Sequence, residues 1–425
     1  MPSPDNPLAR AKRYRYWICL VIFLSYLLVF FHRLCPAVIA LDIQADFGLS
    51  GTVLGLLGSA YFYPYALMQI PTGVLADSWG PRKTIAAFFL VAAAGSVLMG
   101  LAPSLGWAVL GRVMVGGGMA TVFVCNFKLL SQWFCPERFL TMGGLFMAVG
   151  GVGALTAGAP LAWLSDFLGW RLSLAAVGGF TAVMAAAVWL VARDRPQDKG
   201  WPPVNPAPLQ ASGAKPKLLA GIRQVVTARR FWPISLWSFF ATGLSFAMGG
   251  LWGGPYLMQV RGMSKAAAGG VLATFALSLL VGSPLMGAAA NRWGRKPVLA
   301  ACSLVLVLAF GALYLFTADL PQPLLYVVFF GLGLGGAAAG PVIATVSKEL
   351  FPVEIAGASV GMVNLFPFLG GALFQVAMGA IVSWQGEGPG GAPAAAYQTM
   401  FLFTLAGALA SLALSFLLTE TRRRA

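Results

Sequence analysis

Long apolar runs recur along the whole chain and are separated by short polar segments. Each run is about 20 residues long, which is the length of an α-helix that crosses the hydrocarbon core of a bilayer. The runs predict twelve membrane-spanning helices: 17–40, 53–76, 84–102, 106–130, 141–164, 171–192, 232–257, 267–289, 297–317, 323–346, 357–383 and 397–418.

The runs fall into two groups of six. Between them, residues 193–231 are rich in proline and in basic residues, a composition typical of a linker, and one short surface helix is expected near 217–228. We therefore predict an all-α integral membrane protein whose two six-helix bundles surround a central cavity. Its domains are an N-terminal bundle (1–192), a cytoplasmic linker (193–231) and a C-terminal bundle (232–425).

The composition supports a membrane protein and argues against an enzyme. The chain is 59% hydrophobic and only 10% charged, whereas roughly a quarter of the residues of a soluble domain are charged. It has no Walker motif, one histidine, and five cysteines without metal-ligand spacing. We therefore expect no catalytic residue, no cofactor and no metal site.

The charge of the chain is strongly positive, +15, but its distribution does not indicate a nucleic-acid surface. Of the 28 Lys and Arg residues, 22 lie in the termini, the linker and the loops on the same side of the predicted topology. Basic loops face the cytoplasm. We therefore predict that both termini are cytoplasmic and that the protein spans the plasma (inner) membrane several times.

Two stretches of sequence repeat at the same place in the two halves. "GVLADSWGPRK" (73–83) follows the second span and "GAAANRWGRKP" (287–297) follows the eighth, 214 residues later. A weaker pair, "WFCPERF" and "LFPVEIA", places Pro136 and Pro352 at a spacing of 216 residues. Two such pairs at nearly one offset indicate two six-helix repeats.

These motifs resemble the cytoplasmic loop motif of the major facilitator superfamily, and "GRVMVGGGMA" (111–120) resembles the motif of its fourth helix. The resemblance covers the whole chain. It implies two bundles that rock around a central cavity lined by spans 1, 4, 7 and 10. The residues expected to form a conformational latch are Gly73, Asp77, Gly80, Arg82, Lys83, Lys128, Asn291 and Arg295.

Within this latch, the glycines at 73 and 80 permit a tight turn and a close approach of helices. Asp77 can cap a helix or pair with a basic residue, and Lys128 is expected to pair with it or to extend to the surface. Asn291 has no charge, so a weaker latch is expected in the second half. The alternative is that these loops only fix the topology.

Two arginines fall inside predicted spans without an acidic residue nearby. Arg33 in span 1 and Arg112 in span 4 both lie roughly 10 Å below the outer edge of the membrane. Charge inside a membrane is costly and usually functional, and a guanidinium fits a carboxylate or phosphate. The pair therefore predicts an anion clamp. The alternatives are that Arg112 bonds backbone carbonyls and that Arg33 extends to Asp42 or to lipid headgroups.

Other polar residues in the spans are weaker candidates. His32 is the only histidine and a candidate for proton coupling, although it is rotated about 100° from Arg33 on a helix. Further candidates for substrate contact are the stripe Tyr61, Tyr65 and Gln69, which can equally pack between bundles, and Asn126, Trp252 and Asn364.

The sequence therefore predicts a secondary active transporter for a small organic anion. We expect the lipid bilayer and a co-transported proton as its partners, and we expect the transporter to be a monomer. Organophosphate antiporters of the superfamily carry an arginine on span 7 as well. Span 7 here has none before Arg261, which favours a monoanion such as a carboxylate. One alternative is a transporter of amino acids, peptides or amphipathic drugs with structural arginines. Another is a transport-inactive membrane sensor.

Overall fold

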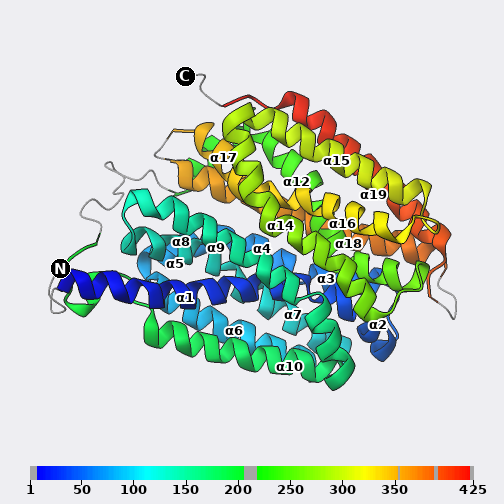
Figure 1. Ribbon diagram of the computed structural model, residues 1–425, viewed down its shortest axis with the longest axis horizontal. Helices are drawn as coiled ribbons and strands as arrows, with labels where there is room; N and C mark the ends of the chain where they lie inside the picture. Colours follow the sequence, from blue (N-terminus) through cyan, green and yellow to red (C-terminus); the bar gives the residue numbers. More distant parts are fainter. Residues whose placement is uncertain (1–6, 205–217, 353–354, 387–390, 422–425) are drawn as a thin grey trace.

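The computed structural model describes residues 7–204, 218–352, 355–386 and 391–421. These residues form two helical bundles that lie against each other, the N-terminal one coloured blue to green and the C-terminal one yellow-green to red (Figure 1). The two ends of the chain lie toward the same end of the molecule, as an even number of spans requires. The centre of the predicted linker, 205–217, and the basic tail at 422–424 lie outside the described residues.

The helices of the N-terminal bundle follow predicted spans 1 to 6 in order. Span 1 consists of α1 and α2, span 2 of α3 to α5, span 3 of α6, and span 4 of α7 and α8. Spans 5 and 6 are formed by α9 and α10. The bounds are α1 (Pro7–Leu34), α2 (Pro36–Phe47), α3 (Gly51–Ser59), α4 (Phe62–Leu67), α5 (Gln69–Ser78), α6 (Pro81–Gly100), α7 (Leu105–Ala120), α8 (Val122–Trp133), α9 (Pro136–Thr156) and α10 (Ala159–Val191).

The linker contains a short 3₁₀ turn, η1, and the predicted surface helix, which is α11. In the C-terminal bundle, η2, η3 and η4 are π-helical turns that interrupt spans 7 and 10. The bounds are η1 (Pro196–Lys199), α11 (Leu218–Thr227), α12 (Phe231–Ala247), η2 (Met248–Trp252), α13 (Gly253–Pro255), η3 (Tyr256–Val260), α14 (Lys265–Trp293), α15 (Arg295–Leu315), α16 (Gln322–Ala337), η4 (Ala339–Ile343), α17 (Ala344–Glu349), α18 (Ala356–Trp384) and α19 (Ala394–Leu417).

The number of spans agrees with the predicted twelve once two irregular segments are recognised. Ten helical segments of the described chain are long and apolar enough to cross a membrane, and α3 to α5 form an eleventh span that is bent by 47°. The 33-residue α10 contains Gly169 with the non-helical angles φ 77° and ψ 157°. The part of α10 before Gly169 completes span 5 together with α9, and the part after it is span 6.

The spans predicted to line the cavity are all interrupted. Span 1 breaks at Cys35, because Pro36 has no N–H to donate to the carbonyl of His32 four residues earlier. Span 4 breaks at Thr121, and spans 7 and 10 contain the π turns. A break in a helix leaves backbone groups without helical partners and turns side chains in unusual directions. In transporters such breaks lie near the middle of the membrane, where the substrate binds.

The bundles meet through small residues and ion pairs. Gly254 of α13 lies so close to the carbonyl of Ala37 in α2 that no side chain fits there. At the end of the molecule opposite the termini, the Lys265 ammonium forms ion pairs with Asp42 (2.8 Å) and Asp166 (3.2 Å) of the other bundle. This end is therefore closed by direct contacts between the bundles.

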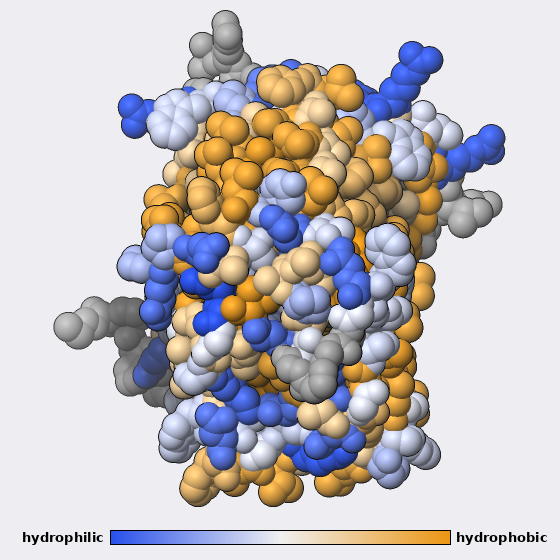
Figure 2. Space-filling model, turned by 90° about the vertical axis from the view of Figure 1, so that its right-hand side faces the viewer, coloured by the Kyte–Doolittle hydropathy of each residue, from blue (hydrophilic) through white to orange (hydrophobic). Residues whose placement is uncertain are grey.

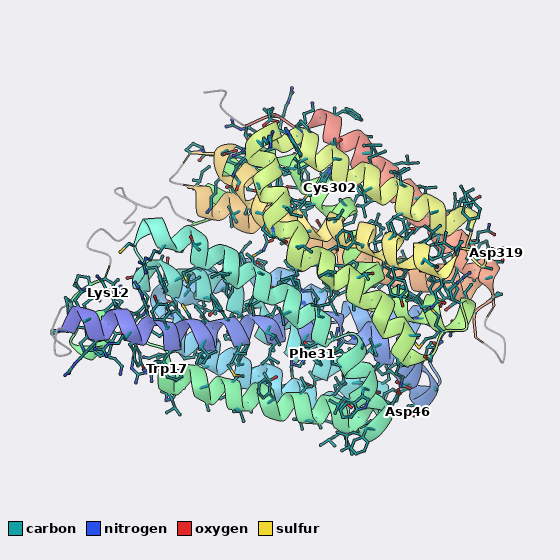
Figure 3. The ribbon with its side chains drawn as sticks, viewed as in Figure 1. Lys12, Trp17, Phe31, Asp46, Cys302 and Asp319 are labelled. Carbon is teal, nitrogen blue, oxygen red and sulfur yellow. The ribbon has the colours of Figure 1, made fainter. Side chains whose placement is uncertain are left out.

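The surface pattern and the positions of the labelled residues agree with helices that run from the end with the termini to the opposite end. The end opposite the termini shows blue and white residues in its centre and orange residues along its flanks (Figure 2). Figure 3 places Lys12 at the end where the termini lie and Asp46 and Asp319 at the opposite end, with Phe31 about halfway between them. The segment of α1 around Phe31, which includes the buried Arg33, therefore lies midway between the two ends of the molecule.

Candidate substrate-binding cavity

A small cavity lies where the two bundles meet. Its free space is about 70 Å³, and both bundles contribute to its wall. The lining residues are Tyr26, Phe30 and Arg33 of α1, Tyr65 of α4, Phe123 of α8, Met147 and Gly151 of α9, Phe246 of α12, Leu279 and Ser283 of α14, Gly336 of α16, Gly340 of η4, and Asn364, Pro367 and Phe368 of α18. The wall thus draws on eight of the twelve spans.

Arg33 is the cation of this cavity. Three lining residues of α1, Tyr26, Phe30 and Arg33, follow one another at intervals of four and three residues, so they share one face of the helix. The arginine side chain is only 3% exposed, and its Nε has no hydrogen-bond partner. No Asp or Glu is among the described residues that line the cavity.

Aromatic rings surround the Arg33 guanidinium. Its Cζ lies 4.6 Å from the ring centre of Phe30, 4.8 Å from Tyr65, 5.0 Å from Phe368 and 5.2 Å from Phe246. The faces of aromatic rings attract cations, so this cage offsets part of the cost of desolvation. It does not neutralise the charge. The alternative interaction with Asp42 is not present, because that carboxylate pairs with Lys265.

Arg112 does not line the same cavity, so the predicted clamp of two arginines is not formed in this structure. It lies on the other side of span 1, where its Nη1 donates a hydrogen bond of 3.0 Å to the carbonyl oxygen of His32. That carbonyl is the one left without a helical partner by Pro36. The alternative interpretation, in which Arg112 bonds a backbone carbonyl, describes its position. Arg112 stabilises the break in span 1.

His32 also points away from the cavity. Its Nε2 lies 3.1 Å from Oγ1 of Thr181 in α10, and the hydroxyl of Thr181 donates to the carbonyl of Val177. The tautomer of His32 decides which of the two groups donates in this contact. His32 therefore lies outside the cavity in this structure, as its rotation of about 100° from Arg33 indicated, and its role in proton coupling stays a prediction.

The polar stripe of span 2 is divided between two roles. Tyr65 lines the cavity, while Tyr61 is fully buried and its hydroxyl lies 3.4 Å from the carbonyl oxygen of Val29. Gln69 accepts a hydrogen bond of 2.7 Å at Oε1 from Nδ2 of Asn364, which belongs to the other bundle. Of the stripe, only Tyr65 reaches the cavity, and Gln69 joins the bundles.

Of the remaining candidates, only Asn364 lines the cavity. Asn126 is buried and donates to the carbonyl of Ile22 and the hydroxyl of Ser25 in α1. Trp252 donates to the carbonyl of Gln375 within the C-terminal bundle. Both side chains are directed into helix contacts, so the expectation that they face the substrate is not met in this structure.

The expected latch contains an ion pair and a capped helix. Lys128 Nζ lies 2.8 Å from Oδ1 of Asp77, which joins the inner ends of spans 2 and 4. Gly80 adopts φ 90°, and the backbone N–H of Arg82 donates to Oδ1 of Asp194 at 2.8 Å. Burial raises the pKa of the Asp194 carboxyl, although the bond from the Arg82 amide opposes the shift.

Other parts of the latch differ from the expectation. A side chain at Gly73 would meet no atom within 4 Å, so the close helix approach predicted there is absent. The side chains of Lys83 and Asn291 are exposed. In the C-terminal bundle, Nη2 of Arg295 pairs with Glu349 at 3.0 Å. The second half therefore has an ion pair of its own.

The phenylalanines of the cage are the site residues that the sequence analysis missed. The spacing of Tyr26, Phe30 and Arg33 on one face of α1 was a signal that could have found Phe30. No comparable signal marks Phe246 and Phe368, because they come from the other bundle and are two of the 30 phenylalanines in the chain.

The fold and the cavity are those of a two-bundle membrane transporter. A family model described as Major Facilitator Superfamily matches residues 18–272 and 254–425. The chain belongs to the Major Facilitator Superfamily, and it is not an enzyme.

Several relatives are similar over nearly their full length. The chain is 27% identical to the "Probable galactarate/D-glucarate transporter GudP" of Bacillus subtilis, covering 90% of this chain and 89% of that protein. It is 25% identical to the "D-galactonate transporter" of Escherichia coli O6:H1, with 92% and 94% covered. It is 26% identical to the "Membrane sensor protein UhpC" of Salmonella typhimurium, with 88% of each covered.

Solved structures share the fold at lower identity. A bacterial homolog to the human lysosomal transporter Spinster, in an inward-facing and unoccupied conformation, superposes with a TM-score of 0.72 at 22% identity, covering 95% of this chain and 96% of that one. A D-xylose-proton symporter superposes with a TM-score of 0.73 at 16% identity, with 96% and 99% covered.

Proposed function

We propose that this protein is a secondary active transporter that moves a small organic carboxylate across the membrane by alternating access, and that Arg33 binds the carboxylate. The observation that carries the proposal is the buried Arg33 guanidinium on the cavity wall, with Nε unbonded and no acidic residue in the lining. A charge at this depth is costly, and a substrate that brings the missing negative charge offsets the cost.

The relatives support the same substrate class. Two of them are named as transporters of galactarate and D-glucarate or of D-galactonate, which are carboxylates. The position of Arg33 also argues against the alternative interpretation, in which the protein transports drugs or peptides and both arginines are structural. Arg112 bonds the carbonyl of His32 away from the cavity, whereas the Arg33 guanidinium lies on the cavity wall among aromatic rings.

Our proposal does not assign proton coupling to His32, the candidate that the sequence suggests. No Asp, Glu or His is among the described residues that line the cavity, and His32 faces Thr181 inside the N-terminal bundle. In our proposal, the substrate binds Arg33 as its anion, and no described side chain of the cavity carries a proton with it.

The proposed site of action is the cytoplasmic (inner) membrane, with both termini in the cytoplasm. The basic loops support this orientation, since 22 of the 28 Lys and Arg residues lie on the side of the termini. The contacts of Lys265 with Asp42 and Asp166 then lie at the outer end and join the bundles there.

A second candidate function is that of a transport-inactive sensor, and the similarity to the sensor protein UhpC favours it. A sensor binds the same anion at Arg33 but does not exchange it across the membrane. The two functions differ in flux and share the binding step.

The test is solute counterflow with purified protein in proteoliposomes. Vesicles are loaded with an unlabelled carboxylate, and the entry of the labelled compound is measured for the parent protein, for Arg33→Gln and for the control Arg171→Gln, whose residue lies at the outer end. We expect exchange by the parent and the control, and none by Arg33→Gln. Binding without exchange would establish the sensor, and exchange that is indifferent to Arg33→Gln would refute the proposed site.

A further inference from the structure

The cavity wall carries very few polar groups that are free for a ligand. Ser283 donates its hydroxyl to the carbonyl of Ala337 at 3.1 Å, and the Asn364 amide donates to Gln69. The hydroxyl of Tyr26 is directed to the sulfur of Met147 at 3.7 Å. Each of these three groups has one hydrogen bond within the protein, which leaves the Asn364 amide an oxygen and a second N–H, and the Arg33 guanidinium is the only charged donor among the described residues of the wall.

Five other residues of the wall are aromatic. The rings of Tyr65 and Phe368 lie 4.2 Å apart, and Phe246 and Phe368 are stacked at 5.9 Å. Phe30 and Phe123 complete the wall on the side of the N-terminal bundle. Such rings favour the face or edge of another ring at similar distances, and of these five residues only Tyr65 carries a hydroxyl that can bond a polar group.

These two observations bear on the body of the substrate. A sugar acid has a hydroxyl on almost every carbon, and each one buried against a ring without a partner loses its hydrogen bonds to water. A dicarboxylate needs a second cation, but Arg33 is the only Lys, Arg or His among the described residues that line this cavity. The wall therefore disfavours both a polyhydroxylated and a dianionic substrate.

We infer that the substrate is a monocarboxylate with an apolar, ring-shaped body. This inference rests on the proposed function and narrows its substrate class beyond the sugar acids for which the relatives are named. The carboxylate binds the Arg33 guanidinium, and the ring lies between Tyr65, Phe246 and Phe368. The body thus spans both bundles, so binding joins the N-terminal cation to the C-terminal rings.

The present size of the cavity indicates where the ring enters. The free space of about 70 Å³ is smaller than an aromatic acid, so the wall has to widen as the substrate binds. Met147 of one bundle reaches so close to Gly340 of the other that a methyl group there would collide with it. An unbranched, flexible methionine can move aside at this point, and its movement would break the contact of its sulfur with the Tyr26 hydroxyl.

The test compares ligands that differ in one property at a time. Dissociation constants are measured by thermal shift of the purified full-length protein for benzoate, cyclohexanecarboxylate, benzamide, galactonate and galactarate. Benzamide has the ring without the charge, and galactonate has one carboxylate with a polyhydroxylated body. We expect benzoate to bind at least about tenfold more tightly than galactonate, which corresponds to roughly 1.4 kcal/mol, and benzamide not to bind.

Variants connect the preference to the wall. Phe368→Leu removes a ring from the cavity, while Phe366→Leu on the same helix removes a ring that contacts Phe231 and Trp232 instead. We expect Phe368→Leu to weaken benzoate binding about fivefold or more, relative to a control that binds like the parent. Arg33→Gln should abolish the binding of benzoate in both backgrounds.

The outcomes separate this inference from the proposed function. Binding of galactonate or galactarate as tight as that of benzoate, and dependent on Arg33, would overturn the inference and leave the proposed carboxylate transporter intact. Stabilisation by benzamide equal to that by benzoate, unchanged by Arg33→Gln, would refute both. Equal effects of Phe368→Leu and Phe366→Leu would show that the aromatic wall does not determine the specificity.

Discussion

The two bundles repeat one helical plan, but only the N-terminal bundle places a cation on the wall of the cavity. Arg33 comes from α1, whereas the C-terminal bundle contributes rings, small residues and the Asn364 side chain. At their inner ends the bundles are more alike, since each has an ion pair and a carboxylate that caps its third span. The comparison teaches that the repeat preserves the frame of the protein, while the chemistry of the cavity is asymmetric.

The largest expected effect comes from replacing Arg33, the residue that makes the cavity asymmetric. Arg33→Gln should lower the rate of carboxylate transport by roughly 100-fold, because the only cation of the described lining is lost. The melting temperature should not fall, since an unpaired buried charge is removed at the same time. Counterflow and thermal unfolding of the same preparation measure both quantities. A large fall in melting temperature with normal transport would show that Arg33 is structural.

The inner loops provide a test of the similarity between the bundles. Gly80 and Gly294 have φ values of 90° and 108°, and each contacts a capping carboxylate, Asp194 or Glu420. Alanine at either position should destabilise the protein by about 1–3 kcal/mol.

The matched control for these variants is Gly73→Ala. That residue lies inside α5 with open space around it, so the change should be neutral or stabilise by about 0.5–1 kcal/mol. Unfolding in detergent at increasing temperature measures all three variants. A cost at Gly80 without a cost at Gly294 would show that the two loops are not equivalent.

The break in span 1 allows a double-mutant test of the second arginine. Arg112→Met deprives the His32 carbonyl of its donor, and Pro36→Ala supplies a backbone N–H in its place. Arg112→Met should therefore cost about 1 kcal/mol less in the Pro36→Ala background than in the parent. The free energy of unfolding of the four proteins gives this coupling. Additive effects would mean that Arg112 does not stabilise the break.

The smallest effect is expected from the pH dependence of the N-terminal cap. Burial raises the pKa of Asp194 in the folded protein, so the folded state binds more protons than the unfolded state between the two pKa values, and stability falls as pH rises through that window. Asp194→Asn removes this titration and keeps an acceptor for the Arg82 amide. Relative to the parent, it should become more stable as the pH rises from 4 to 7.

The control is Asp194→Ala, which lacks the acceptor and should be less stable than Asp194→Asn at both pH values. Melting temperatures at pH 4 and pH 7 provide the comparison. If the parent and Asp194→Asn show the same pH dependence, the carboxyl of Asp194 does not contribute to it.

The sequence predicted the frame of the molecule well because hydropathy and helix length determine it directly. The spans, the linker helix α11 and the division into bundles correspond to runs of apolar residues and to their interruptions. The pairing of Lys128 with Asp77 could also be anticipated, since the repeated loop motif fixes which helix ends meet.

The composition of the cavity was only partly predictable. Arg33 was recognisable from its cost in a membrane, but the directions of Arg112 and His32 depend on the break at Pro36 and on the helix that packs behind it. The rings of Phe246 and Phe368 become neighbours of Arg33 only when the second bundle folds against the first. Contacts of this kind arise from tertiary structure, and no local periodicity encodes them.

The fork that Lys265 forms with Asp42 and Asp166 makes the resting state of the protein sensitive to its surroundings. Opening that end separates one ammonium from two partly exposed carboxylates, at roughly 0.2–1 kcal/mol for each pair. Such energies shift the ratio of closed to open molecules by at most about thirtyfold, and added electrolyte weakens them. A higher salt concentration would therefore increase the fraction of molecules in which this end is open.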